Sequence, residues 1–397
     1  MLWALAWMIL GGTEWGHAQS TPLALPAHAY LYLEPYQLRV EVLIHMPEML
    51  EELGQPIPND LSPEQQKSLT EAAAKKVEPW LSLSLDGAAL SHPPLSSASA
   101  VKGVPGRTEP VGPKDHVAPA DSMVGFVWEV PMPNVPKTLQ LTWQGFDTRI
   151  ASLPGAIFAG QASQEFELSA ASPAFNWQSH GEINLRKPLV AVPPPPAVPI
   201  IGISLAALAA LLVGGVLVLK TTRPATSSRW AAALGVLAVA AFLWVMQVLS
   251  VSIKSPITPK VETTKKQAQD ILGALLRNTY RAFDQTTESG IYDVLARSIS
   301  GDLLQKIYLQ TIGALTLDGQ DGTRVRVNDF SITIDQVIPL PDKRGFEATG
   351  QWNALGTVGH WGHVHMRMNQ YKARITVEPV DGAWKMTALQ VLEERRI

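Results

Sequence analysis

The sequence lacks several features that would point directly to a function. It contains no cysteine, which excludes a small fold held together by disulfides, and charged residues make up only 17% of its 397 residues, which is low for a soluble protein. A glycine-rich phosphate-binding loop, a His-Glu-x-x-His motif and a Gly-x-Ser-x-Gly motif are all absent. Basic stripes with interleaved aromatic residues are absent as well, so nucleic-acid binding is excluded.

The N-terminus predicts an export signal. Residues 1–10 are almost entirely apolar but too few to span a bilayer, and the small residues Gly16 and Ala18 stand at −3 and −1 of a cleavage site. The lysine or arginine that usually precedes the apolar part of such a signal is missing. We nevertheless expect residues 1–18 to be a signal peptide that is cleaved after Ala18.

Two long uncharged runs predict membrane-spanning helices. Residues 197–219 and 230–252 hold no charged side chain over 23 positions each, which is about 34 Å of helix against about 30 Å of hydrocarbon. The alternative is a buried helical hairpin in a soluble core, but core helices seldom stay apolar on every face over this length. Small residues abound in both runs, so close packing of the helices is expected. Because neither run contains a carboxylate or a histidine, we expect an anchor and not a transporter.

The charge of the connecting loop predicts the orientation of this hairpin. Loop 220–229 has three basic residues and no acidic one, which places it in the cytoplasm. The protein is then expected in the inner membrane of a bacterium, with both large domains in the periplasm. Four lysines between residues 254 and 266 oppose this orientation. The export signal has the greater weight, because it decides where the first domain lies.

Short strands separated by proline and glycine predict a β-sandwich in residues 26–190. Apolar residues alternate with other residues through 38–44, which predicts a strand with one buried face. Further strand candidates are 81–85, 124–130, 138–143 and 165–168.

Other elements interrupt or follow these strands. Ser-Pro-Glu-Gln at 62–65 predicts the start of a helix that runs to about Val77. The stretch 92–122 is rich in Ser, Pro, Gly and Ala and predicts a long loop. Four prolines in 191–196 predict a stiff spacer after the domain.

The opening strand, Ala-His-Ala-Tyr-Leu at 27–31, together with the helical insertion resembles the exported N-terminal region of bacterial HupE/UreJ-type proteins. This chain lacks the multi-helix, histidine-containing membrane part of those proteins. The resemblance therefore implies an envelope location more than an activity. His28 and His45 are metal-ligand candidates, but isolated surface histidines are the favoured interpretation.

Residues 260–397 predict three helices followed by a four-stranded antiparallel meander. Apolar residues recur at helical spacing along 268–283, and shorter helices are expected over 291–299 and after Ser300. The apolar period then changes to two, with strands at about 325–334, 345–355, 363–378 and 383–394. This order resembles the NTF2-like, cystatin-like α+β cone, in which a curved sheet wraps around a helix and leaves a pocket. That fold includes isomerases, dehydratases and noncatalytic binding modules, so the resemblance implies no single chemistry.

The densest cluster of chemically active side chains lies in residues 359–369. On a strand, His363 and His365 share one face with Arg367, and His360 can fold back from the turn. The three histidines predict a zinc or copper site, and the nearby methionines suit Cu(I). Arg367 opposes a cation, however, and spacing places no carboxylate beside the imidazoles. A metal site, an acid–base pocket and a hydrogen-bonded or interface cluster stay open, and the last is favoured.

The two outer domains carry charges of opposite sign. Residues 19–196 contain 11 basic and 18 acidic side chains, against 18 and 16 in residues 254–397. Docking of the domains on one another is therefore expected if their shapes also fit, because salt screens charges beyond about 8 Å.

The function that follows is a membrane-anchored envelope protein that acts as a binding or assembly scaffold. Its expected partners are the lipid bilayer and a membrane or periplasmic protein. The alternative is a metal-handling protein or a pocket enzyme that uses His360, His363 and His365, with copper or zinc as the metal. No catalytic residue is assigned.

Overall fold

The computed structural model describes residues 25–397, apart from 105–106, 161, 180, 182, 199, 222–226, 255–261, 321–323 and 342–343. The predicted signal peptide, residues 1–18, lies outside the described residues. The chain divides into two compact units. The first combines the chain up to Pro193 with Thr263–Ile338 and Phe346–Ile397, and the second contains Pro194–Glu262 and Pro339–Gly345. The first unit therefore includes both an N-terminal and a C-terminal folded part.

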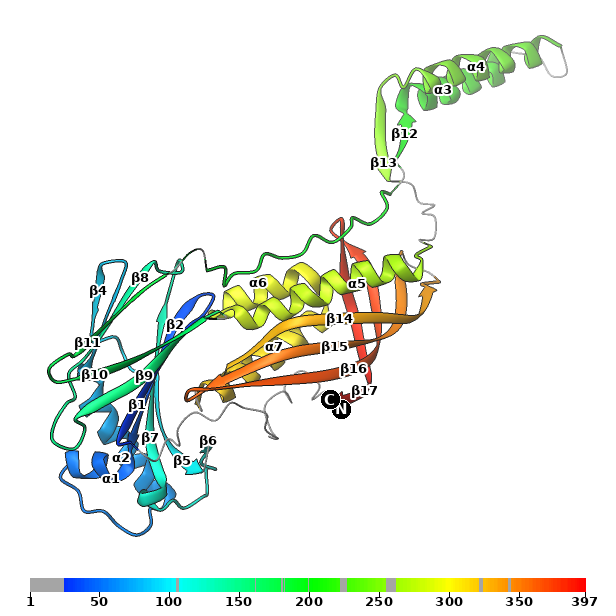
Figure 1. Ribbon diagram of the computed structural model, residues 1–397. Coiled ribbons are helices and arrows are strands. Elements are labelled where there is room, and N and C mark those ends of the chain that lie inside the picture. Colours follow the sequence, from blue (N-terminus) through cyan, green and yellow to red (C-terminus); the bar gives the residue numbers. More distant parts are fainter. Residues whose placement is uncertain are drawn as a thin grey trace. The chain divides into compact units, whose positions relative to one another are not determined.

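The N-terminal part is built from two β-sheets that share one core (Figure 1). Its strands are β1 Ala27–Leu33, β2 Gln37–His45, β3 Leu81–Leu85, β4 Ala88–Ser91, β5 Ser97–Val104, β6 Arg107–Pro110, β7 Ser122–Pro131, β8 Thr138–Trp143, β9 Ser152–Ala159, β10 Ala162–Ser169 and β11 Ala174–Gln178. The seven-stranded sheet has the order β10-β9-β1-β2-β7-β5-β6, and the four-stranded sheet has the order β11-β8-β3-β4. Neighbouring strands are antiparallel, apart from the parallel pair of β1 and β9.

Alternation along the central strands supplies the core between the sheets. Val40 and Val42 of β2 are buried there together with Phe126 and Trp128 of β7. The ring of Trp128 packs edge-to-face on Trp143 of β8, with 6.4 Å between centroids. Aromatic side chains remove the most apolar area per residue from water, so this group is the main source of stability between the sheets.

Two helices join this part, α1 (Met46–Glu52) and α2 (Pro63–Val77). The helix start predicted at residues 62–65 is confirmed. The Ser62 hydroxyl accepts the backbone N–H of Gln65, and the Gln65 side chain accepts the backbone N–H of Ser62 at 2.8 Å. This reciprocal pair satisfies two N–H groups that lack partners in the first turn of a helix.

The long loop predicted over 92–122 is wrong for much of its length. Strand β5 pairs with β7 from Ser97 to Lys102, and β6 pairs with β5. The Ser, Ala and Gly content of this stretch signals a loop, but its backbone groups complete the edge of the larger sheet. Hydrogen bonding to a neighbouring strand therefore outweighs the local preference of these residues.

The C-terminal part consists of three helices and a four-stranded antiparallel meander (Figure 1). The elements are α5 Lys265–Tyr280, the short 3-10 helix η4 Arg281–Asp284, α6 Glu288–Ser298, α7 Asp302–Gln320, β14 Arg324–Pro339, β15 Phe346–His360, β16 His363–Val380 and β17 Ala383–Arg396. Helix α5 begins at a capping box in which the Thr264 side chain accepts the N–H of Gln267. It buries Ile271, Leu272 and Leu275, as its apolar spacing predicts.

The segment after β11 connects the two folded parts of the first unit. The Asn278 side chain of α5 accepts the Val190 N–H at 2.7 Å and donates to the Val190 carbonyl at 2.9 Å. Asn278 is almost fully buried. One amide side chain thus holds both backbone groups of Val190 and fixes the connecting segment to α5.

The expected fold class, a multidomain membrane protein with a two-helix transmembrane hairpin, is wrong. The run 197–219 includes strand β12 (Ile200–Ser204) and most of helix α3 (Leu205–Thr221), whereas helix α4 (Ser227–Val245) ends before the run 230–252 is complete. The last residues of that run enter strand β13 (Ser250–Lys254), which pairs with β12. Since their outer ends form strands, the helices are 17 and 19 residues long.

In the described part of the chain, no helix has both the length and the apolar character that crossing a membrane requires. This finding also overturns the predicted location in a bacterial inner membrane. The expected close approach of the two helices does occur, because a Cβ at Gly214 of α3 would lie only 2.7 Å from Val236 of α4.

Candidate functional site

The predicted metal cluster lies at the turn between β15 and β16. The register pairs His360 with His363 and Val358 with His365, so the backbone brings the three histidines to one end of this hairpin. Their side chains lie outside the described part of the structure, and the zinc or copper site stays a prediction. Among the residues whose side chains are described, no group of three or more His, Asp or Glu is arranged to hold a metal ion.

The two N-terminal histidines are placed differently from each other. His28 is only 6% exposed and stacks parallel to Tyr30, with 6.3 Å between ring centroids. His45 is less buried, and its Nε2 lies 3.1 Å from the carbonyl oxygen of Ala120. The expectation of isolated surface histidines is therefore wrong for His28.

The tip of the β15–β16 hairpin covers the outer face of the seven-stranded sheet. Trp361 at this tip is only 3% exposed. Its indole occupies a cavity in the sheet surface, which we call the Trp361 slot; the slot is formed by Leu43, Val101, Met123, Gly125 and Val127. A Cβ at Gly125 would lie 2.4 Å from Cη2 of Trp361, so only glycine leaves room for the indole at this position.

The turn itself requires a second glycine. Gly362 has a φ of +79°, a conformation that L-residues with side chains rarely adopt. A Cβ at Gly362 would also lie 2.4 Å from the ring of Tyr30. The sequence Trp361-Gly362 therefore combines an aromatic anchor with a turn that lies directly against the sheet.

Three side chains of the sheet bind the backbone of the hairpin tip. Glu41 Oε2 accepts the N–H of Trp361 at 2.6 Å, and the Tyr32 hydroxyl accepts the N–H of Gly362 at 2.8 Å. Arg39 Nη2 donates to the carbonyl oxygen of Gly359 at 3.1 Å. These bonds satisfy backbone groups that the turn leaves without partners, so the tip is buried without losing hydrogen bonds.

A network of buried charges surrounds these contacts. Arg39 contacts Glu41, and its Nε lies 3.3 Å from Glu34 Oε1. Arg326 of β14 also binds Glu34, at 3.1 Å. Arg39, Glu34 and Glu41 are all at most 4% exposed. Two cations and two carboxylates thus alternate across the contact between the N-terminal and C-terminal parts.

Burial changes the acidity of this network. It raises the pKa of Glu41 to about 7, although Arg39 and the Trp361 N–H act in the opposite direction. Burial also raises the pKa of Tyr32, and the nearby Glu41 charge adds to that effect. Tyr32 therefore keeps its proton at neutral pH. Its hydroxyl accepts the N–H of Gly362 and is also hydrogen-bonded to Glu41.

The sequence predicted only one buried face for the strand at 38–44. The apolar face is buried as expected, but Arg39, Glu41 and Leu43 on the other face are buried as well. The pattern gives no sign of this, because the covering residues Gly359 and Trp361 are 320 positions away in the chain. Arg39 and Glu41 on the same face of one strand are the local signal that sequence reasoning overlooked.

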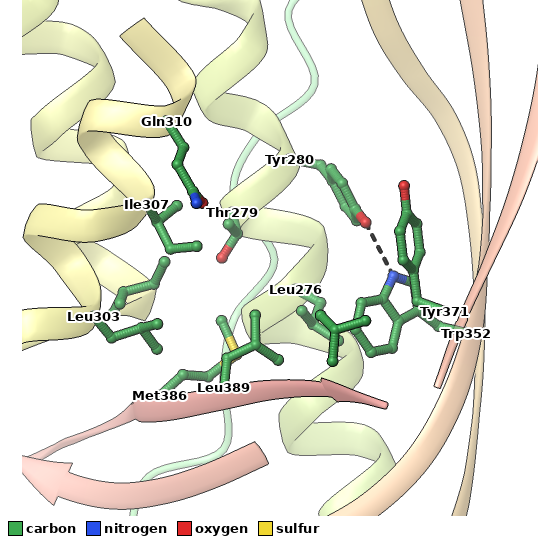
Figure 2. A pocket seen from close by; sticks show the side chains of 12 residues that line it. Leu276, Thr279, Tyr280, Leu303, Ile307, Gln310, Trp352, Tyr371, Met386 and Leu389 are labelled. Carbon is green, nitrogen blue, oxygen red and sulfur yellow. Dashed lines mark hydrogen bonds between the residues drawn. The ribbon is translucent and has the colours of Figure 1, made fainter. Parts of the chain in front are cut away.

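A second candidate site is a pocket between the helices and the sheet of the C-terminal part (Figure 2). It is lined by Leu276, Thr279, Tyr280, Ile299, Leu303, Ile307, Gln310, Trp352, Tyr371, Met386, Leu389 and Val391. Trp352 Nε1 donates to the Tyr280 hydroxyl at 2.9 Å, the bond drawn in Figure 2, and Trp352 stacks on Tyr371.

The chemistry of this pocket does not favour catalysis. None of its lining residues is a carboxylate, an amine or an imidazole. Burial raises the pKa of Tyr371 to about 12 and that of Tyr280 further, so both hydroxyls keep their protons near neutral pH. The volume is about 30 Å³, which is room for one or two water molecules. General acid–base chemistry therefore has no suitable group among these side chains.

Comparison with known proteins adds little to this picture. No family model matches the chain, and no curated protein matches it. Among solved structures, the chain is similar to the intermembrane space region of the chloroplast protein ARC6, with 17% identity and a TM-score of 0.27 over 33% of this chain and 98% of that chain. A TM-score this low does not establish a shared fold. The resemblances to NTF2-like and HupE/UreJ-type proteins stay predictions.

Proposed function

We propose that this chain is a noncatalytic binding or assembly module whose N-terminal and C-terminal parts present one composite surface to a partner protein. The observation that carries the proposal is the contact at the Trp361 slot. There an aromatic anchor, three side chain to backbone hydrogen bonds and a buried charge network all act between the same two parts.

The energetics of this contact support a role in fixing one arrangement. Burying charges such as Arg39 and Glu41 costs desolvation energy that their attraction only partly offsets. An apolar contact of the same size would be at least as stable, but it would tolerate sliding. The charges and the three hydrogen bonds accept one register of the hairpin on the sheet, and a fixed register is what a scaffold needs to hold a partner-binding surface constant.

The C-terminal pocket supports the noncatalytic side of the proposal. A pocket enzyme needs a group that gains or loses a proton near the working pH, and the lining residues described above offer none. The pocket is also too small for a substrate in this structure. The hydrogen bond from Trp352 of β15 to Tyr280 of α5 instead holds the helix against the sheet.

The test uses a variant that blocks the slot. Gly125→Leu places a side chain where the indole lies, on the face of β7 away from the sandwich core, so the N-terminal part keeps its own packing. Gly313→Leu is the matched control, because a Cβ at Gly313 meets open space. Partners cross-linked to the wild-type chain in its source cells are expected to be retained by Gly313→Leu and lost by Gly125→Leu. Equal partner recovery with both variants would refute the proposal.

Metal analysis separates the proposal from the metal-handling alternative. Stoichiometric zinc or copper in the purified chain that disappears on His363→Ala with His365→Ala would overturn the noncatalytic interpretation. Under the proposal, the double variant has the same metal content and captures the same partners as the wild type.

A further inference from the structure

A cavity of about 260 Å³ lies between the N-terminal and C-terminal parts of the first unit, apart from the Trp361 slot. Residues 35–36 and 186–189 form one side, and Arg281, Asp284 and Gln285 form the other. In another protein a cavity of about 150 Å³ is enough to bind benzene. This cavity therefore has room for a small organic molecule or an inorganic ion with its water.

Cations outnumber anions around the cavity. Arg186, Lys187 and Arg281 contribute three positive charges, and Asp284 is the one carboxylate among the lining residues. Asp284 Oδ2 lies 3.3 Å from Arg281 Nη1, so it neutralises at most one of the three. The walls therefore carry an excess of two positive charges, which favours an anionic occupant.

Arg186 uses three of its five N–H donors within the protein. Its guanidinium donates to the carbonyl oxygens of Pro35, Met132 and Pro133 at 2.5 to 2.8 Å. It also stacks on the ring of Tyr36, with 4.5 Å from Cζ to the ring centroid. Arg186 thus holds the wall of the cavity in place and adds its positive charge to it.

Arg281 is in the opposite situation. Its side chain is 14% exposed, and its only hydrogen bond within the described residues goes to Asp284. Its Nε is buried and has no hydrogen-bond partner there, but it faces other protein atoms and not the cavity. The donors left for an occupant are the Nη hydrogens that do not bind Asp284. A planar guanidinium with unused donors is suited to bind an oxyanion.

We infer that this cavity is a binding site for a small oxyanion, the carboxylate or phosphate group of a soluble ligand, held by Arg281 and Lys187 with the amide of Gln285 beside them. Lys187 lies in the connecting segment, next to Arg186, which binds the N-terminal part, and Arg281 belongs to the C-terminal part. A bound oxyanion therefore contacts both parts and stabilises their docked arrangement by mass action. The site is separate from the proposed scaffold function and does not depend on it.

The test titrates the full chain with inorganic phosphate and with succinate by calorimetry at low ionic strength. At least one probe is expected to bind saturably, and added salt is expected to weaken the binding. Gln285→Glu adds a negative charge to the cavity wall without changing side-chain size, so it should weaken binding by about tenfold or more. Gln305→Glu, on an exposed position of α7, makes the same change in net charge and should leave the affinity unchanged.

A second variant addresses the cation directly. Lys187→Gln removes a charge from an exposed position, so the fold is expected to survive and the affinity to fall. Absence of saturable binding of both probes up to about 10 mM would overturn the inference. Equal weakening by Gln285→Glu and Gln305→Glu would overturn it as well, because the effect would then be one of overall charge. Binding of one probe and not the other would identify the oxyanion.

Discussion

Replacing Trp361 by alanine tests whether the hairpin tip is held by its aromatic anchor. A tryptophan side chain buries roughly 200 Å², and at about 25 cal/mol per Å² its removal costs up to about 5 kcal/mol. Measured truncations of buried tryptophan fall at about 3–5 kcal/mol. Since Trp361 is 3% exposed and fills a slot whose floor is a glycine, we expect a loss of about 4 kcal/mol in docking free energy.

Amide hydrogen exchange is the appropriate assay, because the N–H of Gly362 is bound by a side chain of the other folded part and not by the hairpin itself. A loss of about 4 kcal/mol in docking free energy raises the exchange rate of the Gly362 N–H by up to roughly a thousandfold. The increase is smaller if the tip is already fully undocked before that factor is reached. Trp230→Ala is the matched control, since Trp230 is 76% exposed and its removal should leave Gly362 protected. If Gly362 in Trp361→Ala keeps its protection to within about tenfold, the anchor role is refuted.

Three further predictions follow from the described contacts. Burial raises the pKa of Glu41 to about 7 from 4.5, so the docked state binds a proton more readily than the undocked state. Docking should therefore strengthen as the pH falls from 8 to 5. Glu41→Gln should remove this pH dependence of the Gly362 exchange rate. Ser62→Ala deletes the cap of α2 and should cost about 1 kcal/mol in thermal unfolding, whereas a change within about 0.2 kcal/mol contradicts the capping geometry. Asn278→Ala removes both bonds to Val190 and should cost about 1–3 kcal/mol in urea unfolding; unchanged protease cleavage beside Val190 would show that the segment is held by other contacts.

The sequence patterns correctly predicted those elements that are determined by residues close together in the chain. The cap at Ser62 and the apolar stripe of α5 follow from residues within a few positions of one another, and both agree with the structure. The strands after residue 322 also begin close to their predicted positions, because the period-two pattern and the turns between them lie in the same stretch of chain, although β14 and β15 run about five residues further than predicted.

Features that depend on contacts between distant residues could not be predicted from the sequence. The polar face of β2 was expected at the surface, but Trp361 and Gly359 cover it from the far end of the chain. The uncharged run 197–219 has the composition of one long helix, yet its first residues form β12 because β13 offers them a partner strand. Composition alone cannot report such pairing.

The candidate site was predicted only in part. The stretch 359–369 was identified as chemically important, for its histidines. In the structure, the described contribution of this stretch is the pair Trp361-Gly362 and the carbonyl of Gly359. A tryptophan next to a glycine has no distinctive spacing, so its role becomes visible only when the slot around Gly125 is known.

The separation of Glu41 from Trp361 by 320 positions has a consequence during protein synthesis. A ribosome adding about 5–20 residues per second completes β7 roughly 10 to 50 seconds before it adds Trp361. Throughout that interval the nascent sheet exposes Leu43, Met123 and Val127 without their cover. We therefore expect newly made chains to need a chaperone at this stage, and chains truncated before Trp361 to aggregate.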